Sequence, residues 1–147
     1  MNRNNGRLYQ LNHCTYMCNY HIVWVTAYRR KYFEKEWNKR ELRNMVRSIC
    51  RWKGFEIRAW HVGDEHVHLY ISIPPKYSVS YAVNILKGKS SSWIKKKTKR
   101  IEGSVWQRGY FVSTLGINEI VVKKYIESHG KREKDIQISM DLRKAGG

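Results

Sequence analysis

The sequence is poor in cysteine and proline and has no long apolar run. Its three cysteines are an odd number and do not make a disulfide framework, so we expect reduced thiols in a cytoplasmic protein. No apolar stretch approaches the roughly 20 residues that a membrane-spanning helix needs. The N-terminus is polar, with no apolar segment behind it, so we expect neither secretion nor membrane insertion.

Acidic residues are also scarce. The chain has 12 Asp and Glu against 29 Lys and Arg, which gives a net charge of +17 with neutral histidines. An isoelectric point near 10.0 on so short a chain indicates a polyanionic partner, nucleic acid before membrane. With 147 residues, 41% of them apolar, we expect one domain over residues 1–147. Within it, residues 1–12 are expected to be a loose lead-in and residues 131–147 a charged tail.

Hydrophobic patterning predicts an α+β fold. The order of elements is β-α-β-β-α-β followed by one more helix, which is the ferredoxin-like, RRM-like arrangement around an antiparallel sheet. The final helix carries a tyrosine, Tyr125. The expected strands cover residues 13–26, 55–62, 66–73 and 106–114, and the expected helices cover residues 35–53, 78–97 (with a possible interruption near 87–92) and 118–129.

The strand over residues 66–73 carries the sharpest chemical signal. Its apolar residues alternate with polar ones, so His66 and His68 share a face and can both reach one metal ion. An inert pair of histidines on a polar sheet face would show the same spacing. In the last predicted helix, Tyr125 is a potential nucleophile and His129, one turn later, a potential third ligand. Together these residues predict phosphoryl transfer, with a tyrosine oxygen attacking a phosphodiester that a divalent cation polarises.

The sequence resembles the HUH-superfamily single-tyrosine transposases, the transposase A enzymes of the simplest bacterial and archaeal insertion sequences. The resemblance covers most of the chain and rests on a set of motifs in a fixed order. They are Tyr20-His21-Ile22-Val23-Trp24-Val25-Thr26 with Tyr28-Arg29, His66-Val67-His68, Pro74-Pro75, Leu86-Lys87-Gly88-Lys89-Ser90-Ser91, Trp106 with Gly109-Tyr110, and Tyr125-Ile126.

The resemblance implies a dimeric, metal-dependent enzyme that cleaves and rejoins single-stranded DNA at hairpins near the ends of an insertion sequence. Carried over, His66 and His68 bind Mg²⁺ or Mn²⁺, and Tyr125 forms a 5′-phosphotyrosine, with its helix supplied in trans by the partner subunit. Two positions depart from the family. His129 stands where glutamine is typical, which favours softer ions such as Mn²⁺. Glu65 stands where aspartate is common.

The basic residues fit the same prediction. Residues 76–100 contain eight Lys or Arg and no acidic residue. Phosphate contacts of this kind give affinity without sequence information and a steep dependence on salt. The residues that we expect to bind DNA are Arg29, Arg30, Lys87, Lys89, Lys95, Lys96 and Lys97.

Two other hypotheses stay open. A domesticated relative that acts on repeated hairpins of its host genome would use the same chemistry. A non-catalytic nucleic-acid-binding module could also be built on a basic ferredoxin-like sheet, but such a module would offer stacking aromatics where this chain has His66 and His68.

Overall fold

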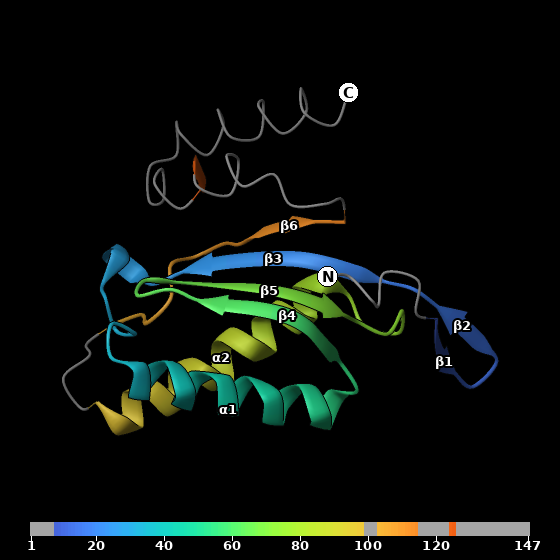
Figure 1. Ribbon diagram of the computed structural model, residues 1–147, viewed down its shortest axis with the longest axis horizontal. Coiled ribbons are helices and arrows are strands. Elements are labelled where there is room, and N and C mark those ends of the chain that lie inside the picture. The colour runs from blue at the N-terminus through green and yellow to red at the C-terminus, as the bar shows by residue number, and fades with distance from the viewer. Residues whose placement is uncertain (1–7, 99–102, 115–123, 126–147) are drawn as a thin grey trace.

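A computed structural model describes residues 8–98, 103–114 and 124–125. Its centre is a four-stranded antiparallel sheet in the order β4-β5-β3-β6 (Figure 1). The strands are β3 (Asn19–Val25), β4 (Glu56–Val62), β5 (His66–Ser72) and β6 (Phe111–Ser113). This order, with antiparallel neighbours throughout, confirms the predicted ferredoxin-like sheet.

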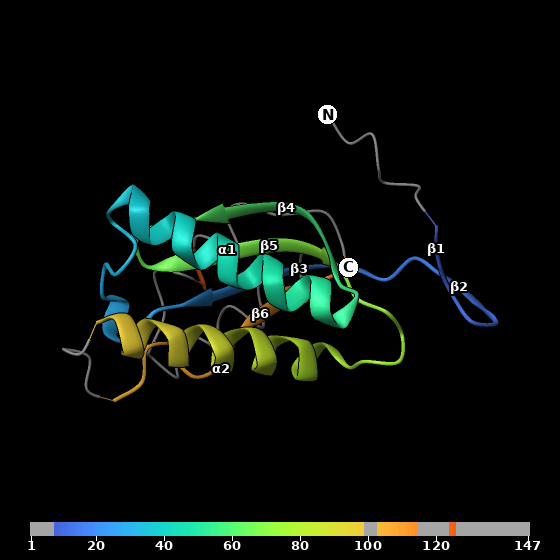
Figure 2. The same cartoon turned by 90° about the horizontal axis from the view of Figure 1, so that it is seen from below.

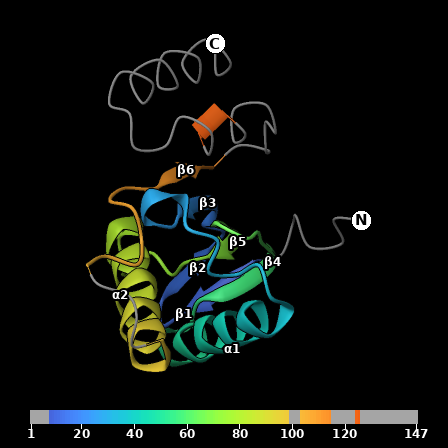
Figure 3. The same cartoon turned by 90° about the vertical axis from the view of Figure 1, so that its left-hand side faces the viewer.

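Two helices, α1 (Glu36–Lys53) and α2 (Val79–Lys97), cover one face of the sheet and lie side by side there (Figures 2 and 3). Gly54 ends α1 in the left-handed conformation, with φ of 76°. Ser78 caps α2 by accepting a hydrogen bond from the Tyr81 amide. Both helices therefore begin or end close to where local sequence signals predicted.

The core fills the space between the sheet and the two helices. Trp24 of β3, Leu69 of β5, Leu42 of α1 and Leu86 of α2 are each completely buried in one cluster. Burying side chains of this size contributes about 1.5–3 kcal/mol each, so this layer supplies most of the driving force for folding. The side chains on the opposite face of the sheet do not belong to this cluster.

The lead-in predicted for residues 1–12 and the single strand predicted for 13–26 are wrong in part. The chain instead forms a hairpin, β1 (Tyr9–Leu11) with β2 (Cys14–Tyr16), before β3 begins. His13 takes a positive φ of 61° in the turn, and the Tyr9 and Tyr16 rings stack with centroids 5.4 Å apart. The hairpin projects beyond the start of β3 (Figure 1). The sequence prediction missed it because the flanking polar residues masked two short strands.

Two further boundaries differ from the prediction. Helix α2 runs through the serine-rich segment without interruption. Its buried Ser90 hydroxyl donates to the Leu86 carbonyl (2.6 Å) and accepts from the Trp106 indole N–H (3.0 Å), which satisfies a group that would otherwise weaken the helix. The strand predicted from residue 106 shortens to β6, because Trp106 makes an isolated bridge to Thr26 and Gly109 breaks the extension with φ of 93°.

Candidate active site

Strand β5 divides its side chains between the two faces of the sheet, as its alternation predicted. Val67, Leu69 and Ile71 are buried under the helices, whereas His66, His68 and Tyr70 point to the other side and are half-buried. We call this second side the histidine face. Helices α1 and α2 both lie on the other side of the sheet (Figures 1 and 3).

One row of residues crosses all four strands on the histidine face. His61 of β4 pairs with His68 of β5, His68 pairs with Val23 of β3, and Val23 pairs with Phe111 of β6. Directly paired residues of antiparallel strands point to the same side. The row therefore runs from the histidines to Phe111 without leaving this face.

Tyr125 lies at the far end of the same row. Its ring contacts that of Phe111, with centroids 5.9 Å apart, and the side chain is half-buried. Strands β5 and β6 are separated by β3, so the strand of Phe111 lies about 10 Å across the sheet from the histidine strand. The proposed nucleophile and the histidine pair thus occupy one side of the molecule, opposite α1 and α2 (Figure 1).

His68 is held as a neutral imidazole. Burial, together with the smaller effects of the neighbouring His21, His66 and His61, lowers the pKa of His68 to about 4. Its Nε2 is buried and has no hydrogen-bond partner among the described residues. A buried, unprotonated nitrogen without a partner is suited to binding a cation, because only the neutral imidazole donates a lone pair.

His66 is oriented from two sides. Its Nδ1 lies 3.3 Å from Glu65 Oε1, and this contact directs the proton to Nδ1 and leaves Nε2 free as an acceptor. Burial lowers the pKa of His66, although Glu65 opposes the shift. The imidazole lies against Gly63, where any Cβ would collide with the ring. Because glycine has no Cβ, position 63 leaves the space that the His66 ring occupies.

Sequence reasoning missed His21 as part of this face. Its ring stacks on that of Tyr70 with centroids 4.3 Å apart and an angle of 6° between planes, and lies 6.2 Å from His68. Burial lowers the pKa of His21 as well. The strand alternation at His21 was a usable signal, but its value depends on knowing that β3 pairs with β5. His61 is exposed, and its ring centroid is 5.6 Å from that of His66.

The residues present fit a divalent metal in part. His66 and His68 supply two neutral nitrogen donors on one face, which is the chemistry that Mn²⁺ and similar ions accept. The described residues contain no cluster of three His, Cys, Asp or Glu side chains able to hold a metal. The predicted third ligand, His129, lies outside the described residues.

The basic residues predicted to bind DNA are spread over both sides of the protein. Arg29 and Arg30 follow β3, where η1 (Ala27–Arg29) presents the exposed ring of Tyr28 with Arg30 5.2 Å above it. Lys89, Lys95, Lys96 and Lys97 lie on α2, in the helical layer and away from the histidine face.

Lys87 is engaged inside the protein. Its Nζ donates to the carbonyls of Gln107 (2.8 Å) and Gly109 (2.9 Å), and burial lowers the pKa of Lys87 to about 8. The side chain thereby ties α2 to the segment that leads into β6. Its predicted contact with DNA stays a prediction.

Comparison with known proteins gives this site its context. Residues 14–129 match the IS200-like transposase family. The transposase of insertion sequence IS200 from Salmonella typhimurium is 36% identical over 129 residues, which cover 84% of each chain. The ISDra2 transposase TnpA of Deinococcus radiodurans is 30% identical over 139 residues, covering 90% of this chain and 94% of the relative.

Solved structures agree with the sequence matches. A chain from Deinococcus radiodurans assigned as a transposase superposes with a TM-score of 0.68 at 27% identity, covering 87% of this chain and 97% of that one. A REP-associated tyrosine transposase bound to a REP hairpin shares the fold, with a TM-score of 0.54 at 17% identity over 76% of this chain and 66% of that chain.

These matches cover most of the chain, and with the fold they define a DNA-processing enzyme. The chain belongs to the family of IS200-like transposases. This confirms the resemblance inferred from the motifs. Within the described ranges, no helix is long and apolar enough to cross a membrane.

Proposed function

We propose that the protein is a metal-dependent transposase that cleaves and rejoins single-stranded DNA through a covalent tyrosine intermediate. The observation that carries this proposal is the row across the sheet, which sets Tyr125 on the same face as His66 and His68. A tyrosine hydroxyl and two neutral imidazoles on one face of the sheet are the groups that such chemistry requires.

In the proposed cleavage step, the Tyr125 oxygen loses its proton and attacks a phosphorus atom of the DNA backbone. The bond from phosphorus to the 3′ oxygen breaks, which leaves a 5′-phosphotyrosine and a free 3′-hydroxyl. Attack by a 3′-hydroxyl on this phosphotyrosine reverses the step and joins DNA, so no external energy source is needed. The bond energy is conserved in the ester throughout.

His66 and His68 would hold a divalent cation, Mg²⁺ or Mn²⁺, with His129 as the predicted third ligand. When bound, the cation supplies charge stabilisation and orientation of the phosphate. The chain's own contribution is to keep both imidazoles neutral and directed, through the burial of His68 and the contact of His66 with Glu65.

We further propose that the substrate carries hairpins near the cleavage sites and that the enzyme works as a homodimer. The structural relative bound to a REP hairpin supports the hairpin substrate. The exposed Tyr28 ring with Arg30 beside it supports contact with unpaired bases, which stack on aromatic rings.

The decisive experiment uses single-stranded DNA from the regions that flank this gene. Wild-type protein, Y125F, H66A and H68A are incubated with it in Mg²⁺, Mn²⁺ or chelator and resolved on a denaturing gel. We expect a covalent protein–DNA band in the wild type with metal, and none in the three variants. Y81F, which alters an exposed tyrosine on α2, is the matched control and should form the band.

The same assay separates the remaining hypotheses. Shifted DNA on a native gel without any covalent band under either metal would contradict catalysis and favour a binding module. Adducts on hairpins repeated elsewhere in the host genome, but not on flanking DNA, would indicate a domesticated enzyme. A mixture of Y125F and H68A that recovers adduct formation would show that Tyr125 acts in trans. If the mixture of Y125F and H68A stays inactive, the result would contradict the action of Tyr125 in trans.

A further inference from the structure

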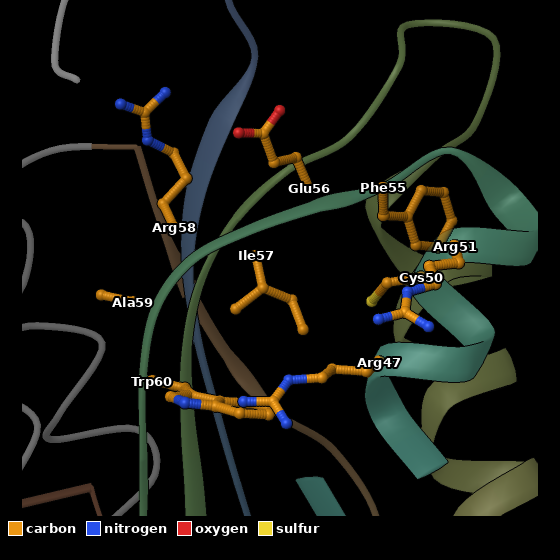
Figure 4. Close-up of a pocket in the computed structure, with 9 residues that line it drawn as sticks. All are labelled: Arg47, Cys50, Arg51, Phe55, Glu56, Ile57, Arg58, Ala59 and Trp60. Atoms are coloured by element: carbon orange, nitrogen blue, oxygen red, sulfur yellow. The ribbon is translucent and has the colours of Figure 1, made fainter. Parts of the chain in front are cut away.

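An open pocket of about 320 Å³ lies between α1 and β4, on the side of the sheet away from the histidine face (Figure 4). Arg47 and Arg51, one helical turn apart on α1, form one wall. Ile57 and Trp60 of β4 form the other. Strand β4 is at the edge of the sheet, so the pocket opens at the border between the two sides of the protein. We call it the α1–β4 pocket.

A β-bulge shapes this pocket. The pairing of β4 with β5 shifts register between Ile57 and Ala59, so Arg58 is an extra residue. In a regular strand, Ile57 and Trp60 would point to opposite faces, because they are three positions apart. The bulge brings both to the helical side, where they pack against the core. Arg58 instead reaches the Tyr9 hydroxyl at 2.8 Å.

The pocket carries uncompensated positive charge. Two other basic side chains of α1 are paired, Lys39 with Asp64 at 3.2 Å and Arg43 with Glu36 at 3.1 Å. In the part of the chain that the structure describes, no carboxylate comes within ion-pair distance of Arg47 or Arg51.

The other pocket residues add no negative charge near these guanidiniums. Figure 4 shows the Glu56 carboxylate directed away from Arg47 and Arg51. Burial raises the pKa of Cys50, at the base of the pocket, to about 12, so its thiol is neutral.

The Arg47 guanidinium is already ordered for binding. It lies 4.7 Å from the centre of the Trp60 ring, a cation–π contact that fixes its plane while its N–H groups remain available. An arginine held in this way loses less conformational entropy when it binds an anion. A flat apolar surface, two guanidiniums and an open mouth together match a nucleotide unit, with its phosphate and its ring.

We propose that the α1–β4 pocket binds the backbone of single-stranded DNA. Arg47 and Arg51 donate to phosphate oxygens, and the attached sugar or base contacts Ile57 and Trp60. The inference deepens the proposed function, since it assumes a single-stranded DNA substrate. A contact of this kind adds affinity and fixes the path of the strand without reading its sequence.

The α1–β4 pocket lies close to the histidine face. Strand β4 lies beside β5, about 5 Å away, and its exposed His61 pairs with His68. A DNA strand that leaves the histidine face therefore has to cross only β4 to reach the pocket. Bound there, it is held on both sides of the sheet edge while Tyr125 acts on it.

Fluorescence anisotropy with a labelled oligothymidylate tests the proposal. The double variant R47Q/R51Q is compared with K35Q/R40Q, which removes the same charge from exposed positions at the start of α1. We expect R47Q/R51Q to raise the Kd at least about tenfold and to lower the slope of log Kd against log salt by about one to two. The control should change the Kd only a few-fold. All four substituted side chains are exposed, so both variants should stay folded, with R47Q/R51Q losing only the cation–π contact of Arg47 with Trp60.

Equal Kd values for the two double variants would overturn the proposal. Competition by thymidine monophosphate as effective as that by the oligonucleotide would also overturn it, because the pocket would then be a site for free nucleotides. A change in oligomeric state on light scattering, without a change in Kd, would assign the pocket to an interface between copies.

The outcome is independent of catalysis. Loss of DNA affinity in R47Q/R51Q together with no adduct in the wild type would support the pocket and refute the transposition chemistry. Wild-type affinity in R47Q/R51Q together with normal adduct formation would refute the pocket and support the transposition chemistry.

Discussion

The imidazole of His21 lies flat on the ring of Tyr70, with centroids 4.3 Å apart and planes only 6° from parallel. The two residues are cross-strand partners in β3 and β5, and the stack lies two pairs along from the row that contains His68, on the same face. Aromatic pairs of this kind contribute about 0.5–1.5 kcal/mol beyond the area they bury. The stack therefore fixes the register of the two strands next to the candidate metal ligands.

Replacing Tyr70 with leucine should lower the free energy of unfolding by about 0.5–1.5 kcal/mol, because leucine keeps apolar area and loses the ring stack. Tyr70→Phe is the matched control, since it keeps the ring and removes only the hydroxyl. Urea denaturation followed by circular dichroism measures both. Equal losses in the two variants would show that the stack itself contributes little.

Acid should destabilise the protein in a way that depends on His68. The pKa of His68 is about 4 in the folded chain and about 6.5 when unfolded, so the unfolded state binds the proton first as pH falls. Stability is complete above pH 6.5 and is lost progressively as pH falls toward 4. Urea denaturation in chelator at pH 7, 6 and 5 measures this loss. H68N should show a shallower dependence on pH, and parallel curves for the two proteins would contradict the assignment.

An added methyl group at Gly63 should disable the site without unfolding the chain. The Cβ of G63A collides with the His66 imidazole, and the ring has to move away from its place beside Glu65. Displacing a ligand in this way typically costs about 10–100-fold in metal affinity or activity, so we expect adduct formation to slow by at least about tenfold.

Gly88→Ala is the matched control for G63A. Position 88 is inside α2 and a Cβ there meets nothing within 4 Å, so G88A should gain about 0.5–1 kcal/mol in stability and keep its activity. A G63A protein that forms adduct at the wild-type rate would show that the His66 ring position is not critical.

Substitutions of Lys87 and Lys89 should have different effects, because we expect Lys87 to stabilise the fold and Lys89 to bind DNA. Lys87→Met removes both hydrogen bonds to the carbonyls of Gln107 and Gly109, at a cost of about 1–3 kcal/mol. Lys89→Met alters an exposed side chain and should change stability by less than about 0.5 kcal/mol while it weakens DNA binding. Thermal unfolding and anisotropy titrations on both variants test the contrast, which fails if Lys87→Met affects only DNA affinity.

Local patterns in the sequence predicted the parts of the fold that depend on local chemistry. The alternation along β5 placed His66 and His68 opposite Val67 and Leu69, and Gly54 marked the end of α1. These features depend on strand period and on backbone conformation, which residues carry individually.

Features that depend on distant partners were not predictable. Ser90 stabilises α2 only because Trp106, sixteen positions later, donates to it. The bulge at Arg58 and the stack of His21 on Tyr70 likewise require the register between strands, which no single segment specifies. The full ligand set stays a prediction, since His129 lies outside the described residues.

The alternation along β5 has an evolutionary consequence. Substitutions on this strand act on one property at a time, because Leu69 belongs to the core and His68 to the opposite face. A deletion or insertion of one residue within the strand would exchange the two faces for every position beyond it. It would bury imidazoles and expose aliphatic side chains in a single event. We expect descendants of this chain to keep the length of β5 nearly unchanged, because both the core and the candidate site depend on it.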